Sequence, residues 1–220
     1  MPTLARRAFA EMIGSFILVV VGTGAIVVDK ATGAVTHPGI ALTFGLVVTA
    51  LIYTLGDVSG AHMNPAVTIG FVIAKRFPIR DAMPYVAAQF LGALAASCFL
   101  AILFPVDLTL GGTHPVGPPW RSFALEVFLT WFLMLAVLSV STGAREKGIM
   151  AGVAIGSVIA LEAMFAGPIS GASMNPARSL APAILSGKLS AVWIYLSAPI
   201  LGAILAVPTF AIIRPSGEQS

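Results

Sequence analysis

The chain has 220 residues, of which 58% are hydrophobic and 10% are charged, and its formal net charge is +3. A soluble domain carries about 25% charged residues and about 45–50% apolar residues, so this composition excludes a soluble globular protein, a disordered chain and a disulfide-rich scaffold. The basic residues form no stripe that could bind nucleic acid. A mean hydropathy of +0.98 predicts a polytopic helical membrane protein.

Six apolar stretches are long enough to cross a bilayer, which takes about 20 residues. Two further apolar stretches, near 64–74 and 175–186, are too short to span and are predicted to be re-entrant segments. The expected fold class is therefore an all-α membrane protein with six transmembrane helices and two re-entrant half-helices. The single cysteine, Cys98, allows no intrachain disulfide and is expected to be a buried small side chain. The expected spans lie near 8–28, 38–56, 82–104, 121–142, 148–167 and 189–213.

The positions of the basic residues predict the orientation of the spans. Positively charged loops stay in the cytoplasm, and placing the N-terminus there puts the larger group of basic residues at the inner ends. The outer ends then hold three basic residues, Lys30, Arg121 and Lys188. Both termini are therefore expected to be cytoplasmic. The eight residues at the inner ends are Arg6, Arg7, Lys75, Arg76, Arg80, Arg145, Lys147 and Arg214.

An internal repeat indicates how the chain is organised. The string SGAHMNPA at 59–66 returns as SGASMNPA at 170–177, with seven of eight positions identical at an offset of 111 residues. A weaker echo is Glu11 in the first span and Glu126 in the fourth. Three spans per repeat is an odd number, so the two halves must insert with opposite orientations. We expect one channel domain over 1–220, with inverted repeats at approximately 1–104 and 120–214 and a connecting extracellular loop at 105–119.

The repeated motif predicts two helix starts that face each other. Asn is a favoured N-cap and Pro suits the first helical position, so half-helices entering from opposite faces would bring Asn64 and Asn175 together near the bilayer centre. The positive ends of two helix dipoles would repel cations there, while each Asn amide could donate to a passing solute. Non-helical backbone at this depth must be buried in protein or line an aqueous path. The pattern predicts a pore for small neutral hydroxylated molecules, lined by the backbone carbonyls of Gly60, Ala61, His62, Gly171 and Ser173.

These residues carry a family resemblance. Asn64-Pro65-Ala66 and Asn175-Pro176-Ala177, followed by Arg178, resemble the paired motifs of the aquaporin (major intrinsic protein) family, and the resemblance covers essentially the whole chain. The strings SGAHMNPAVT and GPISGASMNPARS are most similar to nodulin-like intrinsic proteins of plants and their bacterial relatives. The resemblance implies one pore per subunit, a homotetramer in a lipid bilayer, and buried Glu11 and Glu126 side chains that brace the re-entrant loops. It also suggests a bacterial inner membrane.

The family pattern also implies a selectivity filter with one residue from each of the second and fifth spans and two from the second motif. The matching positions are Phe44, Ala163, Ala172 and Arg178. Water-selective members usually place His at the fifth-span position, so Ala163 implies a wider opening. A Phe wall, two methyl groups and a guanidinium with five donors suit glycerol and other polyols, or neutral hydroxides such as boric acid and arsenous acid.

Other functions are open at this point. A mainly water-conducting channel is the nearest alternative. A secondary transporter would need an ion-coupling site, for which only Glu11, Glu126 and Glu162 are candidates within the membrane. An enzyme is not expected, because no catalytic or metal-binding cluster lies at membrane depth and His37 and His114 are expected in loops; no cofactor or metal is expected either.

Two polar residues admit more than one interpretation. Glu162 precedes Ala163, and one residue turns a helix by about 100°, so Glu162 is expected to face away from the pore. Its role is then a structural hydrogen bond, an intersubunit contact, or gating and pore electrostatics. His62 is expected to brace its loop rather than act as a proton-sensitive gate.

Overall fold

The computed structural model describes residues 2–107, 109–142 and 149–214. Within these ranges the chain is helical, and six helices are long and apolar enough to cross a membrane. The remaining two, α3 and α8, have only 9 and 11 residues. The predicted fold class is confirmed. In chain order the helices are α1 (Leu4–Thr32), α2 (Thr36–Ser59), α3 (Pro65–Ile73), α4 (Ile79–Leu103), α5 (Pro119–Val140), α7 (Ala151–Ser170), α8 (Pro176–Ser186) and α9 (Val192–Ile213).

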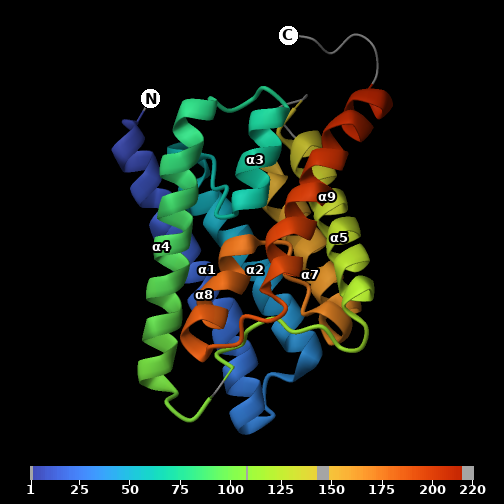
Figure 1. The fold of residues 1–220 in the computed structure, drawn as a ribbon. Helices are drawn as coiled ribbons and strands as arrows, with labels where there is room; N and C mark the ends of the chain where they lie inside the picture. The colour runs from blue at the N-terminus through green and yellow to red at the C-terminus, as the bar shows by residue number, and fades with distance from the viewer. Residues whose placement is uncertain (1, 108, 143–148, 215–220) are drawn as a thin grey trace.

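The six long helices stand side by side, and the two short helices enter the bundle from opposite ends (Figure 1). In that view α3 lies in the upper half and α8 in the lower half. The short helix α3 packs against α9 and α4, and α8 packs against α4 and α9. Because the number of spans is even, α1 begins and α9 ends at the same end of the bundle (Figure 1).

The start of α2 differs from the sequence-based expectation. His37 was predicted to lie in a loop, but it occupies the first turn of α2, where Nε2 lies 2.7 Å from the carbonyl oxygen of Met164 in α7. The helix tolerates Pro38 at this point because the first-turn amides have no intrahelical partner. The preceding helix ends at Gly33, whose φ of 67° closes α1 in a left-handed cap.

The helices cross most closely at glycine residues, which have no side chain. A Cβ built on Gly92 of α4 would lie 2.1 Å from the carbonyl oxygen of Met12 in α1. A Cβ on Gly45 of α2 would lie 2.5 Å from the carbonyl oxygen of Gly156 in α7. In a bilayer the hydrophobic effect does not drive helices together, so this close backbone approach is a main source of packing energy.

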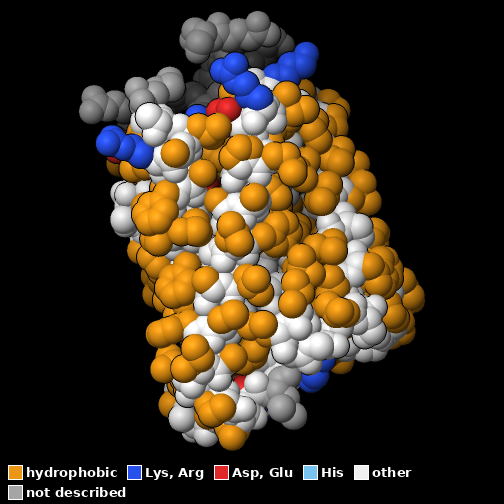
Figure 2. Space-filling model, turned by 60° about the vertical axis from the view of Figure 1, so that its left-hand side comes forward, with side chains coloured by type: hydrophobic (Ala, Val, Ile, Leu, Met, Phe, Trp, Pro, Cys, Tyr) orange, Lys and Arg blue, Asp and Glu red, His pale blue; other side chains and the backbone are white. Residues whose placement is uncertain are grey.

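The outer surface is that of a membrane protein. Hydrophobic side chains cover the middle of the face shown in Figure 2, and Lys and Arg side chains appear towards its upper and lower ends. Cys98 was predicted to be buried, and that prediction is wrong: the residue is exposed on α4 near exposed Phe99 and Ile102. A thiol behaves as a small hydrophobe, so the apolar run that suggested burial in protein equally suits a lipid-facing position.

Apart from the buried Arg178, described basic residues lie at both ends of the bundle. At one end Arg7 pairs with Asp81 at 3.0 Å, and the guanidinium groups of Arg76 and Arg214 both lie over the ring of Phe210. At the other end Lys30 pairs with Asp107 at 3.2 Å. Two of the basic residues predicted at the inner ends, Arg145 and Lys147, lie outside the described residues, as does position 148 at the start of the fifth predicted span.

Candidate functional site

The site begins with two matched helix starts. Asn64 caps α3 and Asn175 caps α8, each in extended backbone conformation with Pro as the first helical residue. Asn64 Oδ1 accepts a hydrogen bond from the amide of Ala66 at 2.9 Å, and Asn175 Oδ1 accepts one from Ala177 at 3.0 Å. The local sequence explains both helices, because the side chain satisfies an amide that no helical carbonyl can reach.

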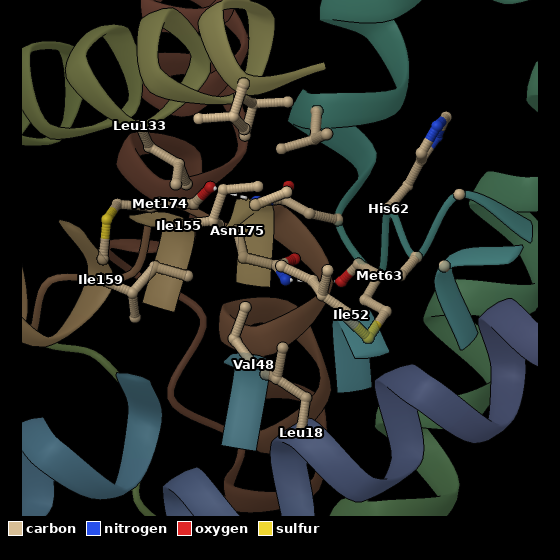
Figure 3. A pocket seen from close by; sticks show the side chains of 18 of the residues that line it. Leu18, Val48, Ile52, His62, Met63, Leu133, Ile155, Ile159, Met174 and Asn175 are labelled. Atoms are coloured by element: carbon tan, nitrogen blue, oxygen red, sulfur yellow. Dashed lines mark hydrogen bonds between the residues drawn. The ribbon is translucent and has the colours of Figure 1, made fainter. Parts of the chain in front are cut away.

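The two asparagines also join the two halves of the chain. Asn64 Nδ2 donates to the carbonyl oxygen of Met174 at 2.7 Å, and Asn175 Nδ2 donates to the carbonyl oxygen of Met63 at 2.8 Å. Figure 3 shows Asn175 between Met63 and Met174. A carboxamide nitrogen carries two hydrogens, so each side chain keeps one N–H beyond these bonds. Both asparagines line the central cavity, where that N–H can reach a solute.

The loops that precede the caps have an unusual backbone. Ala61 and Met63 have φ values of 48° and 49°, and the matching Ala172 and Met174 have values of 42° and 54°. A non-glycine residue in this left-handed region costs of order 1–3 kcal/mol. The surrounding structure must therefore supply contacts that hold each loop in place.

Glu11 and Glu126 supply those contacts. Glu11 Oε1 accepts from Ser59 Oγ at 2.7 Å and from the amide of His62 at 2.9 Å, while Oε2 accepts from the amide of Met63 at 2.6 Å. Glu126 repeats the arrangement with Ser170 Oγ at 2.7 Å, the amide of Ser173 at 2.9 Å and the amide of Met174 at 2.8 Å. Both carboxyl groups are fully buried. Each carboxylate accepts hydrogen bonds from two backbone amides of its loop, which the left-handed backbone leaves without other partners.

The two loops differ in their outer neighbours. Gln89 Nε2 donates to Glu11 Oε2 at 2.8 Å and to Thr68 Oγ1 at 3.0 Å, and His62 Nδ1 lies 3.1 Å from the same hydroxyl. The His62 ring stacks on Phe71 with a centroid distance of 4.7 Å. These contacts give His62 a bracing position. In the second loop smaller hydroxyls replace this cluster: Ser179 Oγ bonds to the hydroxyls of both Ser173 and Thr113.

A cavity of about 760 Å³ passes both asparagines. Its lining extends from Asp57 and Ile149 to Phe44 and Arg178. Figure 3 shows the apolar side chains that converge on it from several helices. Sequence reasoning missed these walls, although Ile155, Ile159 and Ala163 follow the four-residue spacing of one helix face. The apolar lining includes Leu18, Val48, Ile52, Val67, Leu133, Val137, Ile155 and Ile159.

Four of the five residues predicted to offer pore-lining backbone do lie on the cavity wall: Gly60, Ala61, His62 and Ser173. Gly171 is not among the residues on this wall, and its predicted carbonyl role stays a prediction. It closes α7 with a φ of 86° and packs on Thr113, whose Cγ2 would lie 2.9 Å from a Cβ at this position. The motif residues Pro65, Ala66, Pro176 and Ala177 are buried in the first turns of α3 and α8, where they start the helices.

The four predicted filter residues all line this cavity. Arg178 is 2% exposed, and its Nη1 donates to the carbonyl oxygen of Gly111 at 2.9 Å. The guanidinium carbon lies 5.3 Å from the centroid of the Phe44 ring. Ala163 and Ala172 complete the lining with methyl groups. One side of the opening is therefore cationic and rich in N–H donors, and the rest is apolar.

The loop between α4 and α5 holds Arg178 from outside the bundle. Asp107 Oδ1 accepts from the amide of Thr109 at 2.7 Å and from the amide of Leu110 at 3.2 Å. Burial opposes the charge of Asp107, but these bonds and Lys30 outweigh it and keep the pKa of the carboxyl below its usual range. Burial, followed by the charges of Lys188 and Arg178, lowers the pKa of His114. At neutral pH the loop thus carries a charged Asp107 and an uncharged His114.

Glu162 is buried in α7 and does not line the cavity. Neither of its carboxyl oxygens has a hydrogen-bond partner among the described residues. The expectation that it faces away from the pore agrees with this position. The expectation of an intersubunit contact does not agree with this position, because the Glu162 side chain is buried within its own subunit.

No cluster of three or more His, Cys, Asp or Glu side chains that could hold a metal occurs in the part of the chain that the structure describes. The buried carboxylates Glu11 and Glu126 are occupied by backbone amides and hydroxyls. The site therefore offers hydrogen-bond donors, carbonyl oxygens and apolar walls.

Comparisons with known proteins agree with this geometry. The chain is 44% identical to "Aquaporin NIP1-4" from Oryza sativa subsp. japonica, over 99% of this chain and 80% of the relative. It is 43% identical to "Nodulin-26" from Glycine max, over 95% of this chain and 78% of the relative. These plant relatives do not support the predicted bacterial inner membrane.

A solved structure shares the fold. The X-ray structure of the aquaglyceroporin from Plasmodium falciparum matches with a TM-score of 0.84 and 25% sequence identity, over 96% of this chain and 97% of that chain. The family model for the major intrinsic proteins matches residues 1–210. With its six spans, two half-helices and central cavity, the chain is an integral multi-pass membrane channel and not an enzyme, and it belongs to the major intrinsic protein family.

Proposed function

We propose that this channel passes water, glycerol and neutral hydroxides such as boric and arsenous acid, and excludes protons and ions. The observation that carries the proposal is the filter composition. Ala163 and Ala172 contribute only methyl groups to the cavity, so the large groups among the four proposed filter residues are one ring and one guanidinium. The name of the solved relative, an aquaglyceroporin, supports the same class of solute.

Polyols suit this lining for a physical reason. The carbon–hydrogen groups of a polyol can contact the Phe44 ring and the methyl groups favourably, because they form no hydrogen bonds with water. Their hydroxyl groups can accept hydrogen bonds from the guanidinium of Arg178, which lines the cavity, and then from Asn64 and Asn175. The solute thus replaces part of its hydration shell at successive polar positions along an apolar wall.

Charge exclusion follows from fixed positive ends. The N-termini of α3 and α8 face the cavity at the asparagines, and each end carries about half an elementary charge. Arg178 adds a full positive charge in a narrow, poorly hydrated place. A cation such as hydronium meets a barrier at both positions.

We also infer the membrane setting and assembly from the sequence. Both termini are assigned to the cytoplasm, supported by the excess of basic residues at the end where α1 begins and α9 ends. The chain is assigned as two inverted repeats, approximately 1–104 and 120–214, supported by the matched contacts of Glu11 and Glu126. Assembly as a homotetramer rests on the family resemblance.

The solute range can be tested with purified protein in proteoliposomes. Vesicles are shocked with glycerol and, separately, with sucrose, and light scattering is followed by stopped flow. Fast shrinkage followed by fast reswelling in glycerol, but not in sucrose, is the expected result. Fast shrinkage in both solutions without reswelling would show a mainly water-selective channel. A flux that a protonophore abolishes would instead show a secondary transporter.

A further inference from the structure

Gly22 of α1 lies directly behind the Phe44 ring. A Cβ built on Gly22 would lie 2.2 Å from Cε1 and 2.6 Å from Cδ1 of that ring. Carbon atoms in favourable contact are about 3.5–4.0 Å apart, so even one methyl group cannot occupy this place. Gly22 is buried and does not line the cavity. The ring therefore rests against the bare backbone of α1.

Both helices also have close main-chain contacts next to this position. On the far side of α2, a Cβ on Gly45 would lie 2.5 Å from the carbonyl oxygen of Gly156 in α7, so backbone meets backbone there. On α1, a Cβ on Gly111 would lie 2.6 Å from the carbonyl oxygen of Thr23, the residue after Gly22. Both helices are held by rigid main chain, whereas the Phe44 ring can rotate about its side-chain bonds.

The guanidinium of Arg178 also lies beside the ring, 5.3 Å from the ring centroid, and this group is itself bonded to Gly111 through Nη1. The ring also faces the open cavity, which Ala163 and Ala172 line as well. Because Arg178 is fixed from behind, a ring displaced from α1 moves into the cavity and narrows it.

We propose that Gly22 is a positioning residue that sets the width of the filter by holding the Phe44 ring back against α1. This inference rests on the proposed solute range and adds a residue that touches no solute. A glycine at this position makes room for molecules broader than water. A larger residue would convert the same four filter side chains into a narrower opening.

The test compares Gly22→Ala with Gly24→Ala in proteoliposomes, by stopped-flow measurement of glycerol and water permeability. Gly24 lies two residues further along α1, and a Cβ there would meet only Leu100 Cδ2 at 3.4 Å, an ordinary contact. Gly22→Ala should lower glycerol permeability roughly tenfold, the effect of about 1.4 kcal/mol added to the barrier, and should lower water permeability much less. Gly24→Ala should match the wild type. Wild-type glycerol permeability in Gly22→Ala would overturn the inference.

A second background shows whether the effect passes through the ring. In Phe44→Ala protein the ring is absent, so adding Gly22→Ala should leave glycerol permeability unchanged. An equal loss in both backgrounds would mean that Gly22 acts on the fold and not on the filter. If Gly22→Ala alone does not fold, the double variant decides: recovery of folded, conducting protein supports the contact, and failure of both overturns it.

The inference and the proposed function fail in different ways. A wild type that passes no glycerol disproves the proposed solute range, whatever the variants do. Water permeability then tests Gly22, because a ring displaced into a water-sized opening must reduce it. Unchanged water flux in Gly22→Ala would overturn the inference in that case.

Discussion

At the scale of single residues, Asn64 and Asn175 each perform three tasks with one small side chain. The oxygen caps a half-helix, one amide hydrogen bonds to the opposite loop, and the other is left for the cavity. Aspartate would lack both donors, and glutamine would place its amide one bond further away. The residue type is therefore required by the geometry at both positions.

Ala163 is the residue on which the proposed solute range depends most. Replacing Ala163 with His would fill the open side of the filter with an imidazole. We expect glycerol permeability to fall roughly tenfold or more, while water permeability falls much less. Stopped-flow light scattering on reconstituted vesicles measures both. Unchanged glycerol permeability would show that Ala163 does not face the narrow part of the pore.

The buried carboxyl group of Glu162 is expected to destabilise the folded protein. Its buried carboxyl has no hydrogen-bond partner among the described residues, and the matching position 111 residues earlier is Leu51, also buried. Burying an unpaired polar group costs about 1–3 kcal/mol, so Glu162→Leu should stabilise the protein by about that amount. Thermal unfolding in detergent, with channel activity as the control, measures the change. A lower unfolding temperature would mean that the carboxyl has a stabilising contact.

At the scale of elements, each half-helix depends on a carboxylate in a long helix. Glu126 of α5 accepts three hydrogen bonds from the segment that leads into α8, and Glu11 of α1 does the same for the segment before α3. The helices themselves are explained by local sequence. Their placement is not local, because it needs a partner more than 40 residues away.

Glu126→Ala should remove the support of the second loop. Two buried amides and one hydroxyl would lose their acceptor, at about 1–3 kcal/mol each, while the left-handed residues keep their strain. We expect a large loss of thermal stability and of solute permeability. Glu11→Ala is the matched variant, and a comparable loss is expected because it removes the acceptor of two amides, one hydroxyl and the Gln89 side chain. An Ala variant at Glu126 with wild-type stability would contradict the bracing role.

At the scale of the whole molecule, charge exclusion is shared by three positive groups in two helices, since Arg178 belongs to α8. The ends of α3 and α8 act at the asparagines, and Arg178 acts at the filter. Arg178→Ala should therefore keep glycerol and water flux but allow measurable proton or cation leak, since one of the two barriers is gone. A pH-sensitive dye inside the vesicles records the proton leak. A variant that stays tight would show that the half-helix dipoles suffice.

The sequence alone predicted much of the architecture. Apolar runs located all six spans, and the paired Asn-Pro motifs located both half-helices, because span length and helix capping are local properties. The errors have physical reasons. Cys98 belongs to an apolar run that is exposed on the outside of the bundle, and His37 follows a turn-like string that starts a helix.

The cavity walls and the contacts around Phe44 were not predictable from one sequence. They depend on how Gly22, Gly45 and Gly111 let helices and a loop approach, and such distances are set by the assembled bundle. Spacing of four residues on α7 could have indicated that Ile155 and Ile159 share a face with Ala163. It could not have shown which helices stand opposite.

The crossed bonds between the asparagines and the methionine carbonyls have a consequence for biogenesis. The loop before each half-helix accepts a hydrogen bond from the asparagine in the other half of the chain. The two halves are synthesised one after the other. If either half inserted the wrong way round, both amides and both carbonyls would be stranded in the bilayer interior without partners, where each costs several kcal/mol. Correct insertion of both halves and completion of the pore loops are therefore coupled, because neither loop has its full set of hydrogen bonds without the other half.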